Sequence, residues 1–254
     1  MLFAHGFGCD QSMWRFVAPE FEQDHQVILF DHMGSGDSDT SAYQRSKYSS
    51  LHGYADDIVE IARSLDLEDS ILVGHSVSAM IALLAAKKAP ELFARLILVV
   101  PSACYINHPP HYTGGFSRED LEGLLDLMQK NYLGWASFLA PVIMKNEDRP
   151  ELAQELEQSF CRANPEIAQQ FAEVTFLSDH RDDIQGIATP SLILQCEDDA
   201  VAPPSAIEYV HSQLETSVLR TMEATGHCPH VSHPSETIAA IRSYLSAGGA
   251  GPAG

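Results

Sequence analysis

Three residues of the types used in nucleophilic catalysis occur far apart in the chain: Ser76, Asp199 and His227. Ser76 lies between an apolar run suited to a buried strand, residues 71–73, and a strongly helix-forming run, residues 79–86. A sharp turn between strand and helix exposes a serine hydroxyl and aims the first helical N–H groups at an anion formed beside it. The pattern therefore predicts that Ser76 is the nucleophile of an acyl-transfer reaction.

Asp199 and His227 occupy equivalent positions, because each follows an expected strand. The apolar run 191–196 leads into an acidic loop that contains Asp199, and the run 217–222 leads into the loop that contains His227. The chain order serine, acid, histidine is that of α/β-hydrolases and differs from the orders in chymotrypsin and subtilisin. Loops that follow parallel strands gather at one edge of a sheet, so these side chains can converge.

Other interpretations of these loops remain open. Asp198 is adjacent to Asp199 and is the alternative acid, with Asp199 favoured. The cluster of His227, Cys228, His230 and His233 is rich in metal-ligand types. Zinc sites usually draw two ligand pairs from separate segments, and no second pair is evident, so we expect no metal. His75 is interpreted as a structural neighbour of the turn.

A glycine-flexed loop, His5-Gly6-Phe7-Gly8, follows the short apolar run at residues 2–4. Such a loop supplies the second donor of an oxyanion hole in enzymes with this turn. We expect the backbone N–H groups of Phe7 and Val77 to bind the oxyanion. Hydrolysis through an acyl-serine requires no cofactor, and none is expected.

Five segments resemble the α/β-hydrolase group that contains the bacterial stress-response regulator RsbQ and the plant karrikin and strigolactone receptor hydrolases. They span nearly the whole chain: residues 5–14, 27–36, 74–80, 112–116 and 223–230. The bacterial branch matches better, through residues 160–162, 176–181, 194–196 and 226–230. Ser78 stands where the familiar turn motif ends in glycine, a departure that the plant receptors share.

The resemblance implies a triad at Ser76, Asp199 and His227. It also implies a serine hydrolase that acts on or senses a small hydrophobic ester or lactone, as a positive regulator in sigma-factor signalling with a PAS-domain phosphatase as partner. The alternative is a metabolic carboxylesterase or lactonase without a signalling partner.

The expected elements fit an α/β-hydrolase fold: a mainly parallel sheet flanked by helices, with an inserted helical lid. Further strands are expected at residues 27–31 and 96–100, and helices at residues 54–65 and 235–246. The alternation of strands and helices stops near residue 105, where helical patterns such as Leu121, Leu124, Leu125, Met128 and Tyr132 begin. We therefore expect a core at 1–104 and 184–247, a lid at 105–183 and a flexible tail at 248–254.

The lid sequence is rich in aromatic residues. Since ligand pockets are mostly apolar, we expect a substrate site lined by Phe7, Phe116, Trp135, Phe138 and Phe176. For each lid aromatic the competing interpretation is packing within the lid, and Phe7 is the residue for which a binding role is favoured.

Composition excludes several classes of partner. With 15 Lys and Arg against 35 Asp and Glu, the net charge of -20 disfavours nucleic acid and anionic membranes. Five scattered cysteines without a CxxC pair indicate reduced thiols, and no apolar run is long enough to cross a bilayer, so a cytoplasmic protein is expected. The first strand is short, and we expect a preceding β-hairpin lost to a start codon assigned too late.

Overall fold

The central element of the molecule is a six-stranded sheet with every neighbouring pair parallel. A computed structural model describes residues 1–248. The strand order is β2-β1-β3-β4-β5-β6. The strands are β1 (Leu2–Ala4), β2 (Ile28–Leu29), β3 (Ser70–His75), β4 (Phe93–Val99), β5 (Ser191–Asp198) and β6 (Ser217–Thr225). The predicted α/β-hydrolase fold with a parallel sheet is confirmed.

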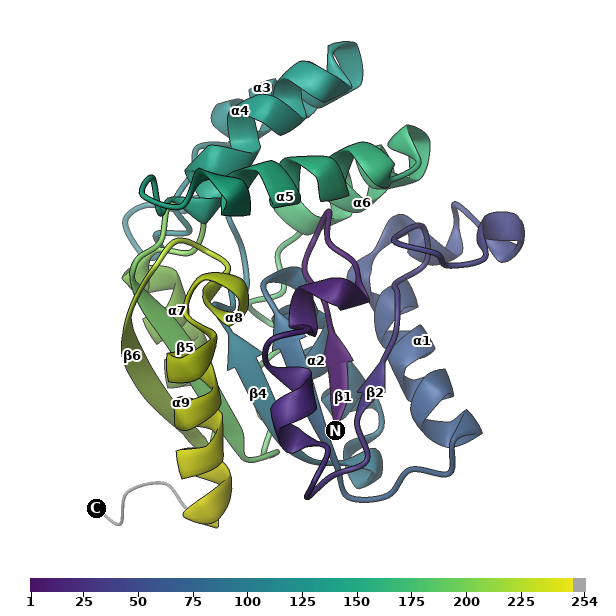
Figure 1. Cartoon of the computed structure of the whole chain (residues 1–254), viewed down its shortest axis with the longest axis vertical. Helices are drawn as coiled ribbons and strands as arrows, with labels where there is room; N and C mark the ends of the chain where they lie inside the picture. Colours follow the sequence, from purple (N-terminus) through teal and green to yellow (C-terminus); the bar gives the residue numbers. More distant parts are fainter. Residues whose placement is uncertain (249–254) are drawn as a thin grey trace.

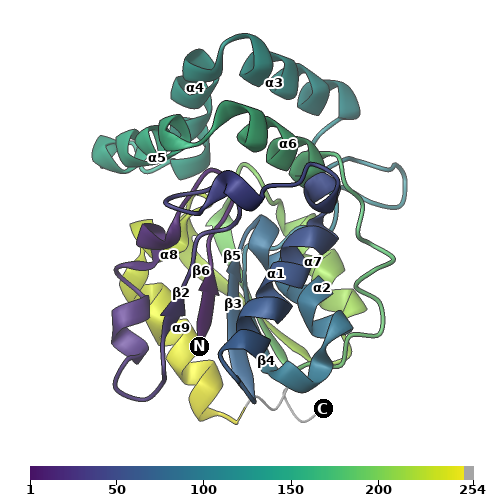
Figure 2. The same cartoon turned by 90° about the vertical axis from the view of Figure 1, so that its right-hand side faces the viewer.

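Helices cover both faces of this sheet (Figures 1 and 2). One face is covered by α1 (Leu51–Ser64), α2 (Val77–Lys88) and α7 (Pro204–Gln213). The other face carries α9 (Pro234–Ser246), the short α8 (Pro229–Ser232) and the N-terminal 3-10 turns. Because both faces are covered, the central strands are apolar on both sides: Leu72, Leu96, Ile97, Leu192 and Ile193 are fully buried.

The strand expected at residues 27–31 is shorter in the structure, where β2 contains only Ile28 and Leu29. In the described sheet β2 pairs only with β1, in the register Leu2 to Ile28 and Phe3 to Leu29. The strand extends only as far as this ladder of hydrogen bonds.

Four helices lie above the carboxyl ends of the strands (Figures 1 and 2): α3 (Arg118–Lys130), α4 (Tyr132–Met144), α5 (Pro150–Arg162) and α6 (Pro165–Phe176). The helical pattern at residues 121–132 is divided between α3 and α4. The break falls at Asn131, whose side chain accepts a hydrogen bond from the Gly134 N–H and so caps the second helix. Apart from Gly248, the expected tail lies outside the described residues.

No helix within residues 1–248 combines the length and apolar character needed to cross a membrane.

Candidate active site

The turn from β3 into α2 holds Ser76 in a rare backbone conformation, with φ of 57° and ψ of -121°. Its N–H donates to the Val99 carbonyl at 2.8 Å, which fixes the turn to the end of β4. At Gly74 a Cβ atom would lie 2.3 Å from the Ser78 carbonyl oxygen, so the turn closes only with glycine there. Positive φ at a non-glycine residue is strained and is held by these surroundings.

The structure brings Ser76, His227 and Asp199 into one hydrogen-bonded chain. His227 Nε2 lies 2.7 Å from Ser76 Oγ, and His227 Nδ1 lies 2.7 Å from Asp199 Oδ2. An ionised carboxylate only accepts, so Nδ1 carries a proton, and the neutral ring leaves Nε2 to accept the Ser76 hydroxyl proton. The three residues come from loops after β3, β5 and β6, as their positions in the sequence predicted.

The side chain of Asp199 is fully buried and has hydrogen-bond partners besides the histidine. Its Oδ1 accepts hydrogen bonds from the N–H groups of Val201 at 2.8 Å and Ala202 at 3.2 Å. Burial by itself would raise the pKa of Asp199, but the adjacent His227 ring and these donors hold it below its usual value. The alternative acid, Asp198, is 61% exposed and pairs with Lys145 Nζ at 2.5 Å, so it faces away from His227.

The lid helps to place His227. Its N–H donates to the Ile143 carbonyl at 2.8 Å, near the end of α4. The preceding Gly226 has φ of 83°, and a Cβ there would lie 2.2 Å from the Met144 carbonyl oxygen, so glycine permits this close approach. His75 Nε2 donates to the His227 carbonyl at 2.7 Å, which gives His75 the structural role expected from the sequence.

The contacts of the Ser78 side chain account for serine at a position where the familiar turn motif has glycine. Its hydroxyl donates to the His5 carbonyl and lies 2.7 Å from His32 Nε2. The side chain thus joins the turn after Ser76 to the loop that contains Phe7. A glycine at this position would remove both contacts.

Four fully buried histidines surround these loops: His5, His32, His75 and His230. Burial lowers the pKa of each, to about 3 for His75. Both nitrogens of His230 are without a hydrogen-bond partner among the described residues, and the ring packs 4.5 Å from Trp14 and 4.3 Å from His75. In the same loop, His227 is hydrogen-bonded to Ser76 and Asp199.

The buried histidines predict acid sensitivity. In the unfolded chain these histidines have a pKa of about 6.5, whereas in the folded protein it is lower. At pH values between the two, the unfolded state binds more protons than the folded state, so the free energy of unfolding falls as the pH drops below about 6.5. Each such histidine lowers the free energy of unfolding by about 1.4 kcal/mol per pH unit across that window. Urea unfolding at about pH 7.5 and pH 5.5 measures the loss. Equal free energies at both pH values would show that the histidines are not buried in their neutral form.

A narrow apolar cavity lies over Ser76 and His227. Phe7 and Cys9 line it from the core side. The lid contributes Ile143, Leu156, Phe160, Thr175 and Phe176. Phe7 is central to the packing around it, because its ring centroid lies 5.6 to 6.2 Å from those of Trp135, Phe160, Phe171 and Phe176.

Two of the five aromatic residues expected to bind substrate, Phe7 and Phe176, line this cavity. Trp135 is buried one layer behind, against Phe7 and Phe160, and the half-buried Phe116 packs with the lid. Phe138 is 58% exposed, because it lies on the outer side of α4. For these three residues the expectation does not match the cavity, since a count of aromatic residues in a helix does not say which side faces inward.

Tyr105 was not expected at the site. Its Oη lies 3.5 Å from Ser76 Oγ, and burial raises the pKa of the phenol well above its usual value. Its position in the loop after β4, at the same edge of the sheet as the other three residues, was the available signal. Thr175 was also missed; its buried hydroxyl lines the cavity and has no hydrogen-bond partner within residues 1–248.

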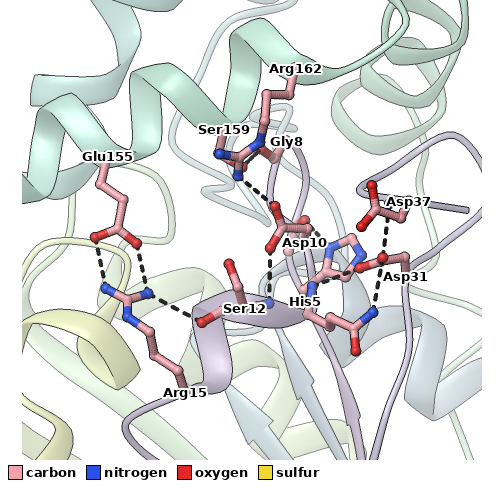
Figure 3. Close-up of polar contacts among 12 residues, drawn as sticks. His5, Gly8, Asp10, Ser12, Arg15, Asp31, Asp37, Glu155, Ser159 and Arg162 are labelled. Atoms are coloured by element: carbon pink, nitrogen blue, oxygen red, sulfur yellow. Dashed lines mark hydrogen bonds and ion pairs between the residues drawn. The ribbon is translucent and has the colours of Figure 1, made fainter.

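One side of α5 is attached to the loop that contains Phe7, and Figure 3 shows the contacts. Arg15 pairs with Glu155 through two contacts of 2.7 Å. Arg162 donates to Asp10 at 2.6 Å, and the Ser159 hydroxyl donates to the Gly8 carbonyl at 2.8 Å (Figure 3). The lid is therefore bound directly to the loop beside Ser76.

Comparisons with known proteins show what this chain is similar to. The karrikin insensitive 2 receptor CA of Petunia hybrida is 35% identical over 246 residues, covering 96% of this chain and 91% of the relative. The strigolactone esterase D14 of Arabidopsis thaliana is 33% identical over 247 residues, covering 96% and 91%. A solved hydrolase from Oleispira antarctica superposes with a TM-score of 0.94 at 43% identity, covering 96% of this chain and 90% of that one.

The family model described as the alpha/beta hydrolase family matches residues 1–241, nearly the full length of the described structure. Such a match leaves no part of the sheet or lid outside the family. This chain therefore belongs to the alpha/beta hydrolase family.

Proposed function

We propose that this protein is a serine hydrolase that cleaves a small hydrophobic ester or lactone through an acyl-serine intermediate. The observation that carries the proposal is the hydrogen-bonded chain of Ser76, His227 and Asp199 at the floor of an apolar cavity. His227 takes the hydroxyl proton as Ser76 Oγ bonds to the carbonyl carbon, and returns it to the departing alcohol oxygen. Water then enters by the same route and releases the acid. Asp199 stabilises the protonated histidine.

The proposed oxyanion donors are the N–H groups of Phe7 and Val77. Val77 is the first residue of α2, so its N–H has no acceptor within the helix and lies next to Ser76. Phe7 lies inside a turn closed by the Cys9 N–H and the Gly6 carbonyl at 3.2 Å. Two donors held by the backbone stabilise the negative charge that develops in the transition state.

The contact of Ser159 with Gly8 leads to a prediction of how the lid affects the loop that contains Phe7. The Ser159 hydroxyl holds the Gly8 carbonyl, next to the Phe7 peptide, so Ser159→Ala should displace the oxyanion donor. If the displaced donor stabilises the transition state by about 1 kcal/mol less, kcat falls by about 5-fold. The KM should change little, because the cavity walls remain. Steady-state kinetics on a short-chain ester measures both constants. Ser137→Ala, an exposed lid serine, is the control, and an equal loss in both variants would contradict the role of Ser159.

The substrate class follows from the cavity. Its walls are mostly apolar, which favours an uncharged compound. The Thr175 hydroxyl, which has no hydrogen-bond partner within residues 1–248, offers one polar contact to a ligand carbonyl or hydroxyl. Names of the plant relatives include strigolactone esterase. This supports ester chemistry on a small molecule.

The hydrolase proposal is tested with p-nitrophenyl butyrate and an analogue that carries a carboxylate on the acyl chain. We expect turnover of the neutral ester, much weaker turnover of the charged one, and transient acylation of the peptide that contains Ser76, observed by mass spectrometry of quenched enzyme. Acylation at another residue, or turnover with no acylated intermediate, contradicts the proposed mechanism.

A second candidate function is signalling of the RsbQ type, with a PAS-domain phosphatase as partner. The outer surface of the lid supports it, because large apolar side chains are exposed there: Leu127, Leu133, Phe138 and Val142. Exposed apolar surface of this kind marks many protein interaction sites. Relatives named as receptors also support it. The alternative is a metabolic carboxylesterase or lactonase.

A pull-down from the source cell separates the two functions. Tagged wild-type protein should recover the phosphatase, and Phe138→Ser should lose it while ester hydrolysis persists. Recovery of no phosphatase, together with rapid consumption of a cellular ester, favours the metabolic enzyme.

A further inference from the structure

We propose that Cys104, His108 and Asp179 form a binding site for a zinc-type divalent cation at the base of the lid. Cys104 Sγ lies 3.7 Å from His108 Nε2, and His108 Nε2 lies 3.8 Å from Asp179 Oδ2. All three ligand atoms lie within 4.8 Å of one another. The site is separate from the proposed hydrolytic residues and does not depend on the proposed function.

The spacing fits a tetrahedral ion. Typical zinc bonds are about 2.3 Å to sulfur and about 2.0 to 2.2 Å to nitrogen and oxygen. At tetrahedral angles, these lengths place sulfur and nitrogen about 3.6 Å apart, and nitrogen and oxygen about 3.4 Å apart. The two observed distances exceed those values by less than about half an ångström. The sulfur of Cys104 and the carboxylate of Asp179 lie within 4.8 Å of each other, so the ion binds after a movement of these two side chains. A fourth position remains for water.

Backbone hydrogen bonds already fix the positions of the three ligand residues in the fold. Cys104 and Asp179 are partners in an antiparallel bridge, and the next residue, His180, donates its N–H to the Ala103 carbonyl at 2.9 Å. The N–H of His108 donates to the Tyr112 carbonyl at 2.9 Å. A site that is preformed in this way loses little conformational entropy when the ion binds.

The ligands come from the two connections between lid and core, which run on the same side of the molecule in Figure 2. Cys104 and His108 lie between β4 and α3, and Asp179 follows α6. A bound cation would join the chain entering the lid to the chain leaving it. It would also fix the residue next to Tyr105, whose hydroxyl lies 3.5 Å from Ser76 Oγ.

The charged groups at the site have opposing effects on cation binding. Arg181 binds both oxygens of Asp179, at 2.8 and 2.6 Å, and its positive charge opposes a cation. A carboxylate has about four lone-pair sites, so Oδ2 can bind a metal while Arg181 orients the group. On binding, the S–H bond of Cys104 breaks, a zinc–sulfur bond forms and the proton passes to solvent. Thiolate with imidazole favours zinc over magnesium or calcium.

Access is open from the solvent side. The side chains of His108 and Asp179 are 41% and 39% exposed, whereas Cys104 is buried behind them. An ion can therefore reach the two outer ligands first and then bind the thiolate. The other group with metal-ligand types among the described residues, formed by His52, His180 and Asp183, has its carboxylate already bonded to His180 Nδ1 at 2.8 Å.

The test is titration of the metal-free full chain with Zn²⁺ in a calorimeter and with Co²⁺ in a spectrophotometer. We expect one Zn²⁺ per chain, release of a proton, and a thiolate-to-cobalt charge-transfer band. Cys104→Ser should abolish that band. His108→Asn should weaken zinc binding at least about 10-fold and should remove the rise in Tm that zinc causes in the wild-type protein. His108 is partly exposed, so this variant should fold normally without metal.

Two controls assign the ligands. Cys161→Ser removes an exposed thiol on α5, and His52→Asn removes a ligand of the other group; neither should change zinc affinity or the cobalt band. The proposal is overturned if the band persists in Cys104→Ser, if His52→Asn rather than His108→Asn weakens binding, or if the wild-type protein binds no zinc at millimolar concentration.

Discussion

The Ser76→Ala variant should lose covalent labelling by a fluorophosphonate probe and about 10⁶-fold of its esterase kcat, the scale found when the nucleophile of another serine hydrolase is removed. The reason is chemical: Oγ forms the bond to the carbonyl carbon, and no other hydroxyl lies at 2.7 Å from His227 Nε2 in the described structure. Intact-mass analysis after probe treatment, with kinetics on p-nitrophenyl butyrate, measures both losses.

The variant should still fold. Alanine at position 76 keeps the same positive φ, and the N–H that donates to Val99 is retained. A Tm close to that of wild type therefore separates lost chemistry from lost structure. Ser205→Ala, an exposed serine on α7, should be labelled normally. Labelling that persists in Ser76→Ala would remove this residue from the nucleophile's role.

Asp199→Asn should lower kcat by about 10⁴-fold, the loss known for the equivalent aspartate of another triad. An amide can present N–H to the histidine, which favours the tautomer with the proton on Nε2, and that ring cannot accept the Ser76 proton. The variant also removes the negative charge that stabilises the protonated ring. Steady-state kinetics gives the loss in kcat, and labelling by the fluorophosphonate probe should slow in parallel.

Asp198→Asn is the matched control, because it makes the same change one residue earlier. Asp198 pairs with Lys145 at the surface, so its loss should change kcat by less than about 3-fold. If instead Asp198→Asn removes activity and Asp199→Asn retains it, the proposed acid is wrong and the loop adopts another arrangement during catalysis.

Local sequence determined the turn at Ser76, because only a small set of residues permits it. Gly74 admits the Ser78 carbonyl, and an apolar strand followed by a helix-forming run fixes where the turn falls. The order of Ser76, Asp199 and His227, each after a strand, then predicts one edge of a parallel sheet, since such strands all end at the same side. These features depend on chain neighbours and on topology, so the sequence was sufficient for them.

Tertiary structure decided which neighbouring residues face the site. Asp199 points to His227, whereas Asp198 points to solvent, and no local pattern separates two adjacent acids in a loop. Likewise Phe176 reaches the cavity and Phe138 does not, because the packing of four lid helices sets which side of each helix faces inward.

The sequence by itself thus determined the fold class, the turn at Ser76 and the chain order of Ser76, Asp199 and His227. Only the tertiary structure placed Tyr105 beside Ser76, attached α5 to the loop of Phe7, and brought Cys104 and His108 next to Asp179. The physical reason is that periodicity and turn chemistry act over a few residues, whereas these contacts join segments whose distance apart is fixed by how the whole core and lid pack.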